Sequence, residues 1–307
     1  MIKYIGKRLL MLIPVVIGIT FFIFLILSVA PGDPAAMLAG ADATPQMIAE
    51  KREELGLNDP LLVRYVTYMA KAVTGDFGNS WFSGFNVMSE FVGRLPNTLR
   101  LGMMAMAISA LVGISLGVVT AVKQYSGVDY VTLAVAMLFS SMPAFWFGLM
   151  AQIYFALRLH WLPATGADSW IHFILPAVTL AAAQLAGQVR MTRSSMLDVI
   201  KQDYVRTARA KGCTEKRIVL HHVMRNGMLP VVTGLGMSFA NLLGGAIVTE
   251  SVFSIPGVAS LMINAVKIRD VPVVMGILFV ISIFVGVVNL CVDLLYGLID
   301  PRVKFGR

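Results

Sequence analysis

Six long apolar runs constrain this chain more than any other feature of its sequence. A helix needs about 20 predominantly apolar residues to cross about 30 Å of hydrocarbon, and only helices and closed barrels satisfy every backbone group in lipid. The sequence therefore predicts an all-α polytopic membrane protein with six transmembrane helices. The runs lie near residues 9–30, 97–122, 130–157, 171–199, 228–250 and 273–299. Pro143 and Pro176 fall in the third and fourth runs, where we expect kinks.

The composition supports a membrane protein and argues against a nucleic-acid partner. The chain is 57% hydrophobic and 14% charged, whereas soluble domains carry about 25% charged residues. The net charge is +8, but the Lys and Arg residues lie between apolar runs rather than on one soluble face, so membrane topology explains them. The first run is longer than the roughly 7–15 residues of a signal-peptide core, and we expect it to be retained. Cys213 and Cys291 are expected to be free thiols.

Six spans place both termini on one side of the membrane. That side carries most of the 25 Lys and Arg residues, which predicts cytoplasmic termini and a cytoplasmic 200–227 segment. The opposite side holds the long 31–96 loop. In this loop Thr44 and Pro45 predict the start of one short helix. A second helix, predicted within 59–75, would carry five apolar side chains on one face, and these could pack on the spans or receive a partner: Leu62, Tyr65, Val66, Met69 and Val73.

Small residues recur at four-residue spacing in two of the runs. They are Ser109, Gly113 and Gly117 in the second run and Gly236, Ala240 and Gly244 in the fifth. Such spacing lets helix backbones approach closely, which predicts either packing within the chain or a seam with another subunit.

The stretch "DYVRTARAKGCTEKRIVLHHVMRNGMLP" at 203–230 is basic within an otherwise apolar chain. It predicts a helix over 203–211 that ends at Gly212, then a second helix capped by Thr214 that runs until Gly227 and Pro230 open the fifth span. Three interpretations are open: a surface helix held by anionic lipid, a metal or proton site at His221–His222, or a docking element for a separate cytoplasmic protein. Adjacent histidines project about 100° apart on a helix, which disfavours chelation.

The words "DYVRTARAKG" (203–212) and "HHVMRNGMLPVVT" (221–233) resemble the EAA coupling loop of ABC-importer membrane subunits, specifically the dipeptide, oligopeptide, nickel and glutathione permease family. Where the general pattern has Glu-Ala-Ala, this chain has Arg206, Thr207 and Ala208, and its Leu-Pro lies further from the Gly. Both departures also resemble the peptide-type branch. The resemblance covers nearly the whole chain, through "PGDP" (31–34), "GDFGNS" (75–80), "RMTRSSMLDV" (190–199), "SVFSIPGV" (251–258), "RDVPVV" (269–274) and "NLCVDLLYGLIDPR" (289–302).

The resemblance implies a type I ABC-importer permease fold, with one transmembrane permease domain over 1–307 in a bacterial cytoplasmic (inner) membrane. It implies four kinds of protein partner: a homologous second permease, two cytoplasmic ATPase subunits and an extracytoplasmic solute-binding protein. Within the coupling loop, Gly212 would form the turn, Ala208 would allow close approach, and basic residues would form a polar rim. The residues expected to couple to the ATPase are Tyr204, Arg206, Thr207, Ala208, Arg209, Lys211, Gly212, Glu215 and Arg217.

The chain itself lacks a nucleotide-binding P-loop, because Gly6-Lys7 is followed by Arg8 rather than Ser or Thr. We therefore expect no catalytic site, metal or cofactor on this chain, with ATP and Mg²⁺ used by the partner ATPases. Three segments carry candidates for the translocation path, although core packing and inter-helix hydrogen bonds are equally good accounts of them. The candidates are Ser141, Met142, Phe145, Trp146, Gln184, Gln188 and Asn241.

Together these features predict the permease subunit of an ATP-driven importer that moves a dipeptide, an oligopeptide or glutathione into the cytoplasm. A nickel-chelate importer of the same family is the nearest alternative. An ion-coupled secondary carrier is a further alternative, disfavoured because the spans show no set of carboxylates for ion coupling. A membrane enzyme is disfavoured because no nucleophile–base pair is evident.

Overall fold

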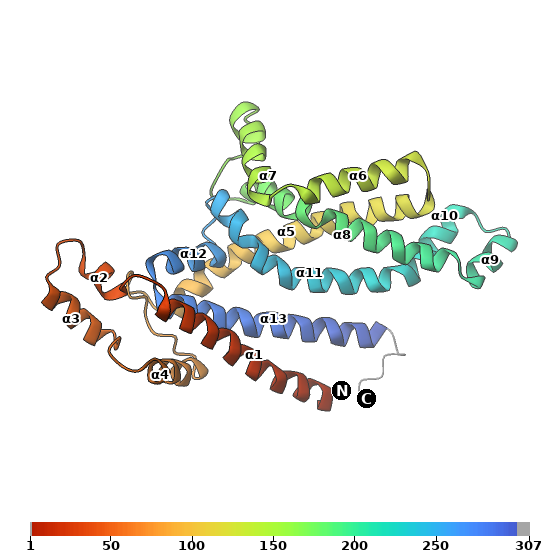
Figure 1. Cartoon of the computed structure of the whole chain (residues 1–307). Coiled ribbons are helices and arrows are strands. Elements are labelled where there is room, and N and C mark those ends of the chain that lie inside the picture. The colour runs from red at the N-terminus through yellow and green to blue at the C-terminus, as the bar shows by residue number, and fades with distance from the viewer. Residues whose placement is uncertain (1, 300–307) are drawn as a thin grey trace. The chain divides into compact units, whose positions relative to one another are not determined.

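The computed structural model describes residues 2–299 of the 307-residue chain, with the side chains of 2–3, 240–245 and 295–299 left out. Within these ranges the chain is built from helices and contains no strand, only an isolated bridge between Asn79 and Asn86, which confirms the all-α class. The α-helices (Figure 1) are α1 (Ile2–Val29), α2 (Pro34–Ala39), α3 (Pro45–Glu54), α4 (Leu61–Val73), α5 (Val87–Val122), α6 (Gly127–Ser141), α7 (Ala144–Ala151), α8 (Ile174–Ile200), α9 (Asp203–Ala210), α10 (Glu215–Arg217), α11 (Met224–Val252), α12 (Val258–Ile268) and α13 (Val271–Ile299).

Each of the six apolar runs falls in a helix or a helix pair. Among the described residues, four helical segments are long and apolar enough to cross a membrane, within α1, α5, α8 and α13, and the α6–α7 pair makes a fifth if it counts as one span. The fifth run lies in α11, where part of the helix is outside the described side chains. The chain is thus a multi-pass membrane protein.

The third run is not the single kinked helix that we expected. The chain leaves the helix at Met142 and Pro143, and the helix pair on either side is bent by 97°. Proline cannot donate the backbone hydrogen bond that would join the two halves, and it keeps the preceding residue extended. Here Met142 has φ −74° and ψ 133°, so Pro143 ends one helix and starts another.

Pro176 does not kink the fourth span, contrary to the sequence-based expectation. It is the third residue of α8, where the backbone N–H would lack an intrahelical partner in any case. The prolines that do lie inside long helices are Pro14, Pro96 and Pro230.

The predicted domain over 1–307 contains two compact units. The first comprises residues 1–96 and 257–287, and the second comprises 97–256 and 288–307. In the first unit, α12 and the first turns of α13 pack against the 72–91 segment through Ala72, Phe77, Val87, Leu261 and Val274.

Loop chemistry ties the same unit together around the start of α13. The Asp270 carboxylate accepts hydrogen bonds from the Ser80 hydroxyl and from the backbone N–H of Trp81 at 3.1 Å. The Arg269 side chain donates to the last carbonyls after α1, those of Ala30, Pro31 and Gly32. The "PGDP" and "RDVPVV" words, 235 or more residues apart in sequence number, are therefore in direct contact.

Thr44 caps α3 as predicted, accepting a hydrogen bond from the Met47 N–H at 3.4 Å, and Pro45 is the first helical residue. The predicted helix within 59–75 is α4, at Leu61–Val73.

In the second unit, α8 is the central helix, and the small residues of α5 pack directly on it. A Cβ atom added to Gly113 would lie 2.5 Å from the Cγ of Gln188. A Cβ added to Gly117 would meet the Thr192 side chain and lie 2.9 Å from the backbone oxygen of Val189. The predicted close approach is confirmed for this helix pair. In the fifth run, Gly236 packs in the same way on Val292, whereas Ala240 and Gly244 lie outside the described side chains.

We expect Gly117→Ala to destabilise the folded protein by about 1–3 kcal/mol, because the added methyl group overpacks a seam with no room for it. Gly187→Ala in α8 is the matched control, since a Cβ there has nothing within 4 Å. The control should be neutral or slightly stabilising because Ala favours helix over Gly. Thermal unfolding of the purified variants in detergent would measure both, and equal unfolding temperatures would contradict the packing argument.

Candidate functional site

The basic stretch forms a tight helix–turn–helix in which Gly212 makes the turn. The Gly212 N–H donates to the carbonyl of Arg209 at 2.9 Å, and the Cys213 N–H donates to that of Ala208 at 3.2 Å. This pair of bonds closes a Schellman motif, which needs a left-handed residue after the helix end. Gly212 supplies it with φ +78°, as the sequence predicted.

The inner face of α9 is anchored in the core of the second unit. Val205 and Ala208 are buried, and they belong to the same apolar cluster as Met196 of α8 and Ile218 and Val223 of the following segment. The cluster fixes α9 to the end of α8. Ala208, only 7% exposed, is therefore not part of the outer surface. We expected its small size to allow a partner to approach, but it serves packing within the chain.

Arg209 and Glu215 clasp the two sides of the turn. The Arg209 Nε donates to one carboxylate oxygen of Glu215 at 2.7 Å and its Nη2 to the other at 3.3 Å. This hydrogen bond with the guanidinium holds the pKa of Glu215 below its usual range. Both side chains are exposed, so we expect the clasp to restrict the turn rather than to stabilise the whole fold.

A second tie joins α9 to α11. The Asn226 side-chain amide donates to the Tyr204 hydroxyl at 2.8 Å. Asn226 was not predicted to have a role, because its contact with Tyr204 joins residues that lie in different helices. Tyr204 is thus held by the chain itself, although the residue is 42% exposed.

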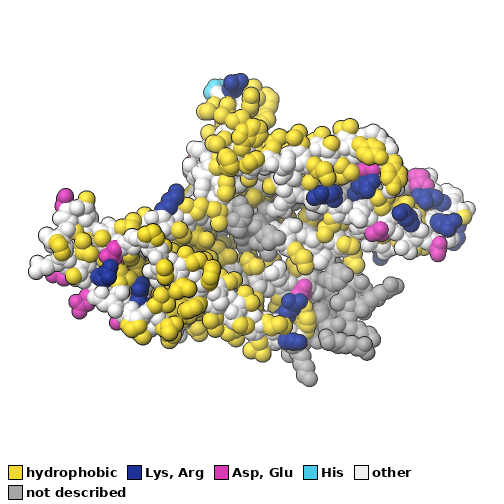
Figure 2. Space-filling view, viewed as in Figure 1, with side chains coloured by type: hydrophobic (Ala, Val, Ile, Leu, Met, Phe, Trp, Pro, Cys, Tyr) yellow, Lys and Arg dark blue, Asp and Glu magenta, His cyan; other side chains and the backbone are white. Residues whose placement is uncertain are grey.

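The outer face of the turn is basic. Arg206, Thr207, Lys211 and Arg217 are exposed, and Figure 2 shows Lys and Arg side chains gathered over α9 and α10. Arg206 lies 3.9 Å from Asp203, a distance at which an exposed pair contributes little. Leu220 adds an exposed apolar side chain to the same segment.

Three details of this segment differ from the prediction. Thr214 occupies the N-cap position, but its side chain makes no capping hydrogen bond. The chain between Ile218 and Val223 is a π-helix that leads directly into α11. Gly227 and Pro230 consequently lie inside α11 instead of opening it. A Cβ atom at position 227 would lie 2.9 Å from the methyl carbon of Met196. The close approach of the Met196 side chain therefore favours glycine at this position.

The His221 and His222 rings lie edge to face with their centroids 5.8 Å apart. Across the described residues, no group of three or more His, Cys, Asp or Glu side chains could hold a metal ion.

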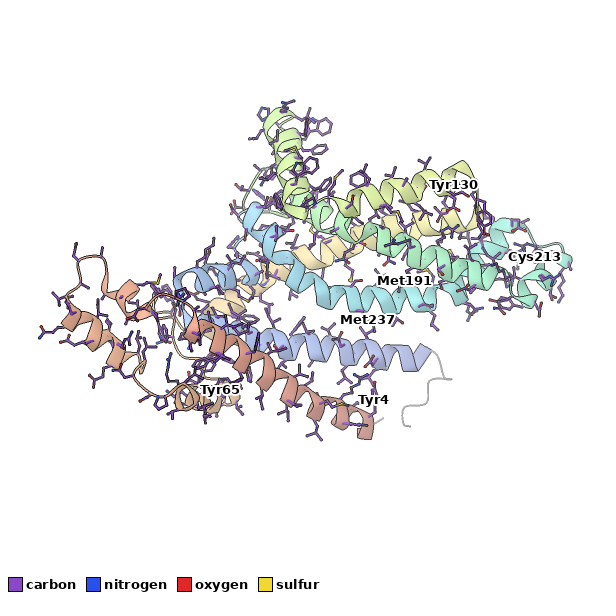
Figure 3. The ribbon with its side chains drawn as sticks, in the orientation of Figure 1. Tyr4, Tyr65, Tyr130, Met191, Cys213 and Met237 are labelled. Carbon is purple, nitrogen blue, oxygen red and sulfur yellow. The ribbon has the colours of Figure 1, made fainter. Side chains whose placement is uncertain are left out.

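A polar cavity of about 470 Å³ lies between α8 and α11 in the second unit. Both predicted glutamines line it, together with Ser140, Arg190, Met191 and Ser238. Gln188 is buried and packs on Gly113, and its Nε2 has no hydrogen-bond partner within the described side chains. Figure 3 labels Met191 and Met237, which mark the facing segments of α8 and α11.

Four of the other predicted path residues, Ser141, Met142, Phe145 and Trp146, do not line this cavity. Ser141 and Met142 form the break between α6 and α7, with the Ser141 hydroxyl donating to the Leu138 carbonyl at 2.9 Å. Phe145 and Trp146 lie on α7 and are exposed. The Asn241 side chain lies outside the described residues.

Ser140 has a position that the sequence did not reveal. Its hydroxyl donates to the Ala182 carbonyl at 3.3 Å and accepts from the Ala186 N–H at 3.1 Å. A regular helix would pair these two backbone groups with each other. The hydroxyl therefore inserts beside the hydrogen-bond ladder of α8 at Gln184, which is a recognised cause of bending.

Two further buried polar contacts lie in the second unit. Arg193 of α8 donates to both carboxylate oxygens of Asp129 at 2.8 and 2.7 Å, which locks the start of α6 onto α8. The Glu250 carboxylate, fully buried near the end of α11, accepts from the Thr98 hydroxyl at 2.6 Å. Asp129 and Glu250 are thus buried carboxylates with hydrogen-bond partners in the second unit.

Comparison with protein families decides the assignment. Residues 113–305 match the family described as binding-protein-dependent transport system inner membrane components, and residues 1–102 match the N-terminal domain that accompanies it. The chain belongs to this family. It is a permease subunit of an ABC importer, as its sequence predicted.

The curated relatives of this permease extend over its full length. It is 42% identical over 334 aligned residues to the dipeptide transport system permease protein DppB of Alkalihalophilus pseudofirmus, covering 99% of this chain and 100% of the relative. It is 42% identical over 305 residues to the glutathione transport system permease protein GsiC of Escherichia coli K12, again covering 99% and 100%.

Solved structures confirm the fold class. The permease resembles an inward-facing structure of the MetNI methionine ABC transporter with a TM-score of 0.58 and 15% identity, over 69% of this chain and 97% of that one. It also resembles an amino acid ABC transporter crystallised with histidines, with a TM-score of 0.52 and 18% identity, over 70% and 95%. The fold is that of a type I importer permease.

We expect Glu215→Gln to speed hydrogen–deuterium exchange of the Gly212 and Cys213 amides, because the neutral amide cannot form the charge-assisted clasp. Lys216→Gln, next along the chain and outside the clasp, should leave that exchange unchanged. Because the folded pKa of Glu215 is depressed, the clasp is present at neutral pH and is lost as pH falls through that pKa. Equal exchange in the two variants at neutral pH would contradict a clasp.

Proposed function

We propose that this permease moves a peptide-like solute, a dipeptide, an oligopeptide or glutathione, into the cytoplasm. The observation that carries this proposal is the 42% identity, over 99% of the chain, to permeases named for dipeptide and glutathione transport. The cavity on α8 supports it, because Gln184, Gln188 and Ser238 offer uncharged donors and acceptors beside the charged Arg190. Such groups suit the amides of a peptide backbone and make no demand on its side chains.

The proposed transporter complex contains this chain, a homologous second permease, two cytoplasmic ATPase subunits that use ATP and Mg²⁺, and an extracytoplasmic solute-binding protein. In it, the termini and the 200–227 loop face the cytoplasm, and the exposed face of α9 and α10 docks on an ATPase. This face comprises Tyr204, Arg206, Thr207, Arg209, Lys211, Gly212, Glu215 and Arg217. The Schellman turn, the Arg209–Glu215 clasp and the apolar cluster restrict the movement of this face relative to α8.

Uptake by the purified complex tests the solute class. The chain, isolated in mild detergent with the subunits that accompany it, is reconstituted in vesicles with its binding protein and a labelled dipeptide. We expect uptake to require ATP on the side of the membrane that corresponds to the cytoplasm. Uptake should continue when the proton gradient is collapsed. Uptake of a nickel chelate with no peptide uptake would move the assignment to the other branch of the family.

Charge reversal tests the docking face. We expect Arg206→Glu to reduce ATP-driven uptake at least several-fold while the protein stays in the membrane, because the exposed guanidinium has only a distant partner among the described residues, Asp203 at 3.9 Å. Lys123→Glu is the matched control, an exposed basic residue outside α9 and α10. Uptake and stimulated ATPase activity are measured in the same vesicles. Unchanged coupling in Arg206→Glu would remove this residue from the docking face.

Substitution within the cavity tests the path. We expect Gln184→Ala to alter uptake while ATPase docking, measured by co-purification, is unchanged. Phe145→Ala on α7 should have a smaller effect, since that ring does not line the cavity. A larger effect of Phe145→Ala would place the path along α7.

A further inference from the structure

Helix α4 packs across α1 well before the end of that span. The Tyr65 hydroxyl donates to the Ile17 carbonyl at 3.0 Å and shares a hydrogen bond of 2.9 Å with the Thr20 hydroxyl. The Tyr65 ring packs on Phe21 and Phe24, with centroid separations of 5.1 and 5.6 Å. In Figure 1, α4 is seen nearly end-on while α1 runs across the page, and Figure 3 shows Tyr65 at this crossing. All of these residues belong to the first compact unit.

One side of α4 is apolar and uncovered. The sequence predicted Leu62, Tyr65, Val66, Met69 and Val73 as one face, but only Tyr65 of these is buried. Leu62, Val66 and Val73 are 63%, 62% and 74% exposed. A groove of about 560 Å³ continues this surface onto α1 and α13, and its lining is almost entirely carbon. The groove is lined by Leu9, Ile13, Ile17, Val66, Met69, Val73, Phe279 and Ile283, among others.

The other side of α4 is polar. Arg64, Thr67 and Lys71 follow one another at three- and four-residue spacing and border a cavity of about 280 Å³ with Asp76 and Trp81. The Arg64 guanidinium lies over the Phe24 ring, 5.5 Å from its centroid. Arg64 also borders a smaller polar cavity with Leu27 and Ser28, the last turn of α1.

The two sides are ordered along α1. The apolar groove meets α1 at Leu9 to Ile17, towards the middle of the span, and the polar side meets it at Phe24 to Ser28, towards its end at Val29. Phe24 lies five residues before that end and Ile17, whose carbonyl accepts from Tyr65, lies twelve residues before it, or about 7.5 and 18 Å along the axis. Interfacial amphipathic helices sink about 5–10 Å into the boundary between headgroups and acyl chains. The polarity of α4 matches that placement, and its contacts with α1 lie at that depth or deeper.

We propose that α4 is a membrane-embedded interfacial helix whose Leu62–Val66–Val73 face contacts lipid acyl chains, with Arg64 and Lys71 extending towards the headgroups. The apolar face is continuous with exposed apolar residues of α1, such as Leu9 and Ile13, on a helix long and apolar enough to cross a membrane. Long basic side chains reach the interface from such a depth by extending their stems. A protein partner is disfavoured, because it would not require the polarity of α4 to change along the membrane normal. Exposure to water is disfavoured, because the helix would then carry an unusually large apolar patch.

Spin labels on neighbouring residues test this placement. In a chain carrying Cys213→Ser and Cys291→Ser, single labels are attached at Val66→Cys and Val73→Cys, with Thr67→Cys as the control one residue away on the polar side. The full chain, with the subunits that accompany it, is placed in bilayers of phosphatidylethanolamine and phosphatidylglycerol. Power-saturation measurements then compare accessibility to oxygen, which concentrates in lipid, with accessibility to a water-soluble nickel chelate.

We expect the ratio of oxygen to nickel-chelate accessibility to be several-fold higher at positions 66 and 73 than at position 67. Greater nickel accessibility at 66 would place α4 in water and overturn the proposal. Shielding of 66 and 73 from both reagents would show that protein covers the face, which also overturns it. Leu62→Cys on the same face gives an independent reading if the label at 66 disturbs folding, and neither result depends on which solute is carried.

Discussion

Lipid offers no hydrogen bonds to a peptide backbone, and the rest of this structure depends on that constraint. It explains why the apolar runs became helices. It also determines how the fold treats the sharp break at Met142 and Pro143 between α6 and α7. At that break the Ser140 hydroxyl contacts the Ala182 carbonyl and the Ala186 N–H of the neighbouring helix. A side chain at the interrupted end of one span thereby supplies a partner to the backbone of another.

Polar and close-packed contacts hold the helices where apolar side chains alone could not specify a neighbour, because lipid is as apolar as a leucine. Gly113 and Gly117 let α5 approach α8 until side chains of α8 fill the space of the missing Cβ atoms. Asp129 and Arg193 fix the start of α6 on the same helix. Removing either charge would leave the other poorly compensated, which is more costly than losing both. α8 is thus positioned on two sides by contacts with defined geometry.

The features predictable from sequence were those set by a few adjacent residues. Thr44 and Pro45 start a helix, and Gly212 takes the left-handed turn, because backbone sterics act within one or two peptide units. Features set by distant packing were missed. Gly227 and Pro230 read as breakers but lie inside α11, where Met196 fills the space beside Gly227. Ala208 was expected to allow a partner to approach, but it is buried in the apolar cluster that includes Ile218 and Met196. The arrangement of apolar and polar side chains on α4 can be interpreted only when their positions along the α1 axis are known.

The same helix that forms the cavity also anchors the basic turn. Gln184 and Gln188 line the cavity on α8, and Met196 and Leu197 of α8 hold Val205 and Ala208 of α9. Gln184 and Met196 are twelve residues apart, or about 18 Å along a helix. If the proposed ATPase displaces the turn, the displacement would act on α8 through this packed cluster as well as through the short connection at 201–202. Ser140 contacts α8 at the level of Gln184, so bending there would change the cavity lining directly.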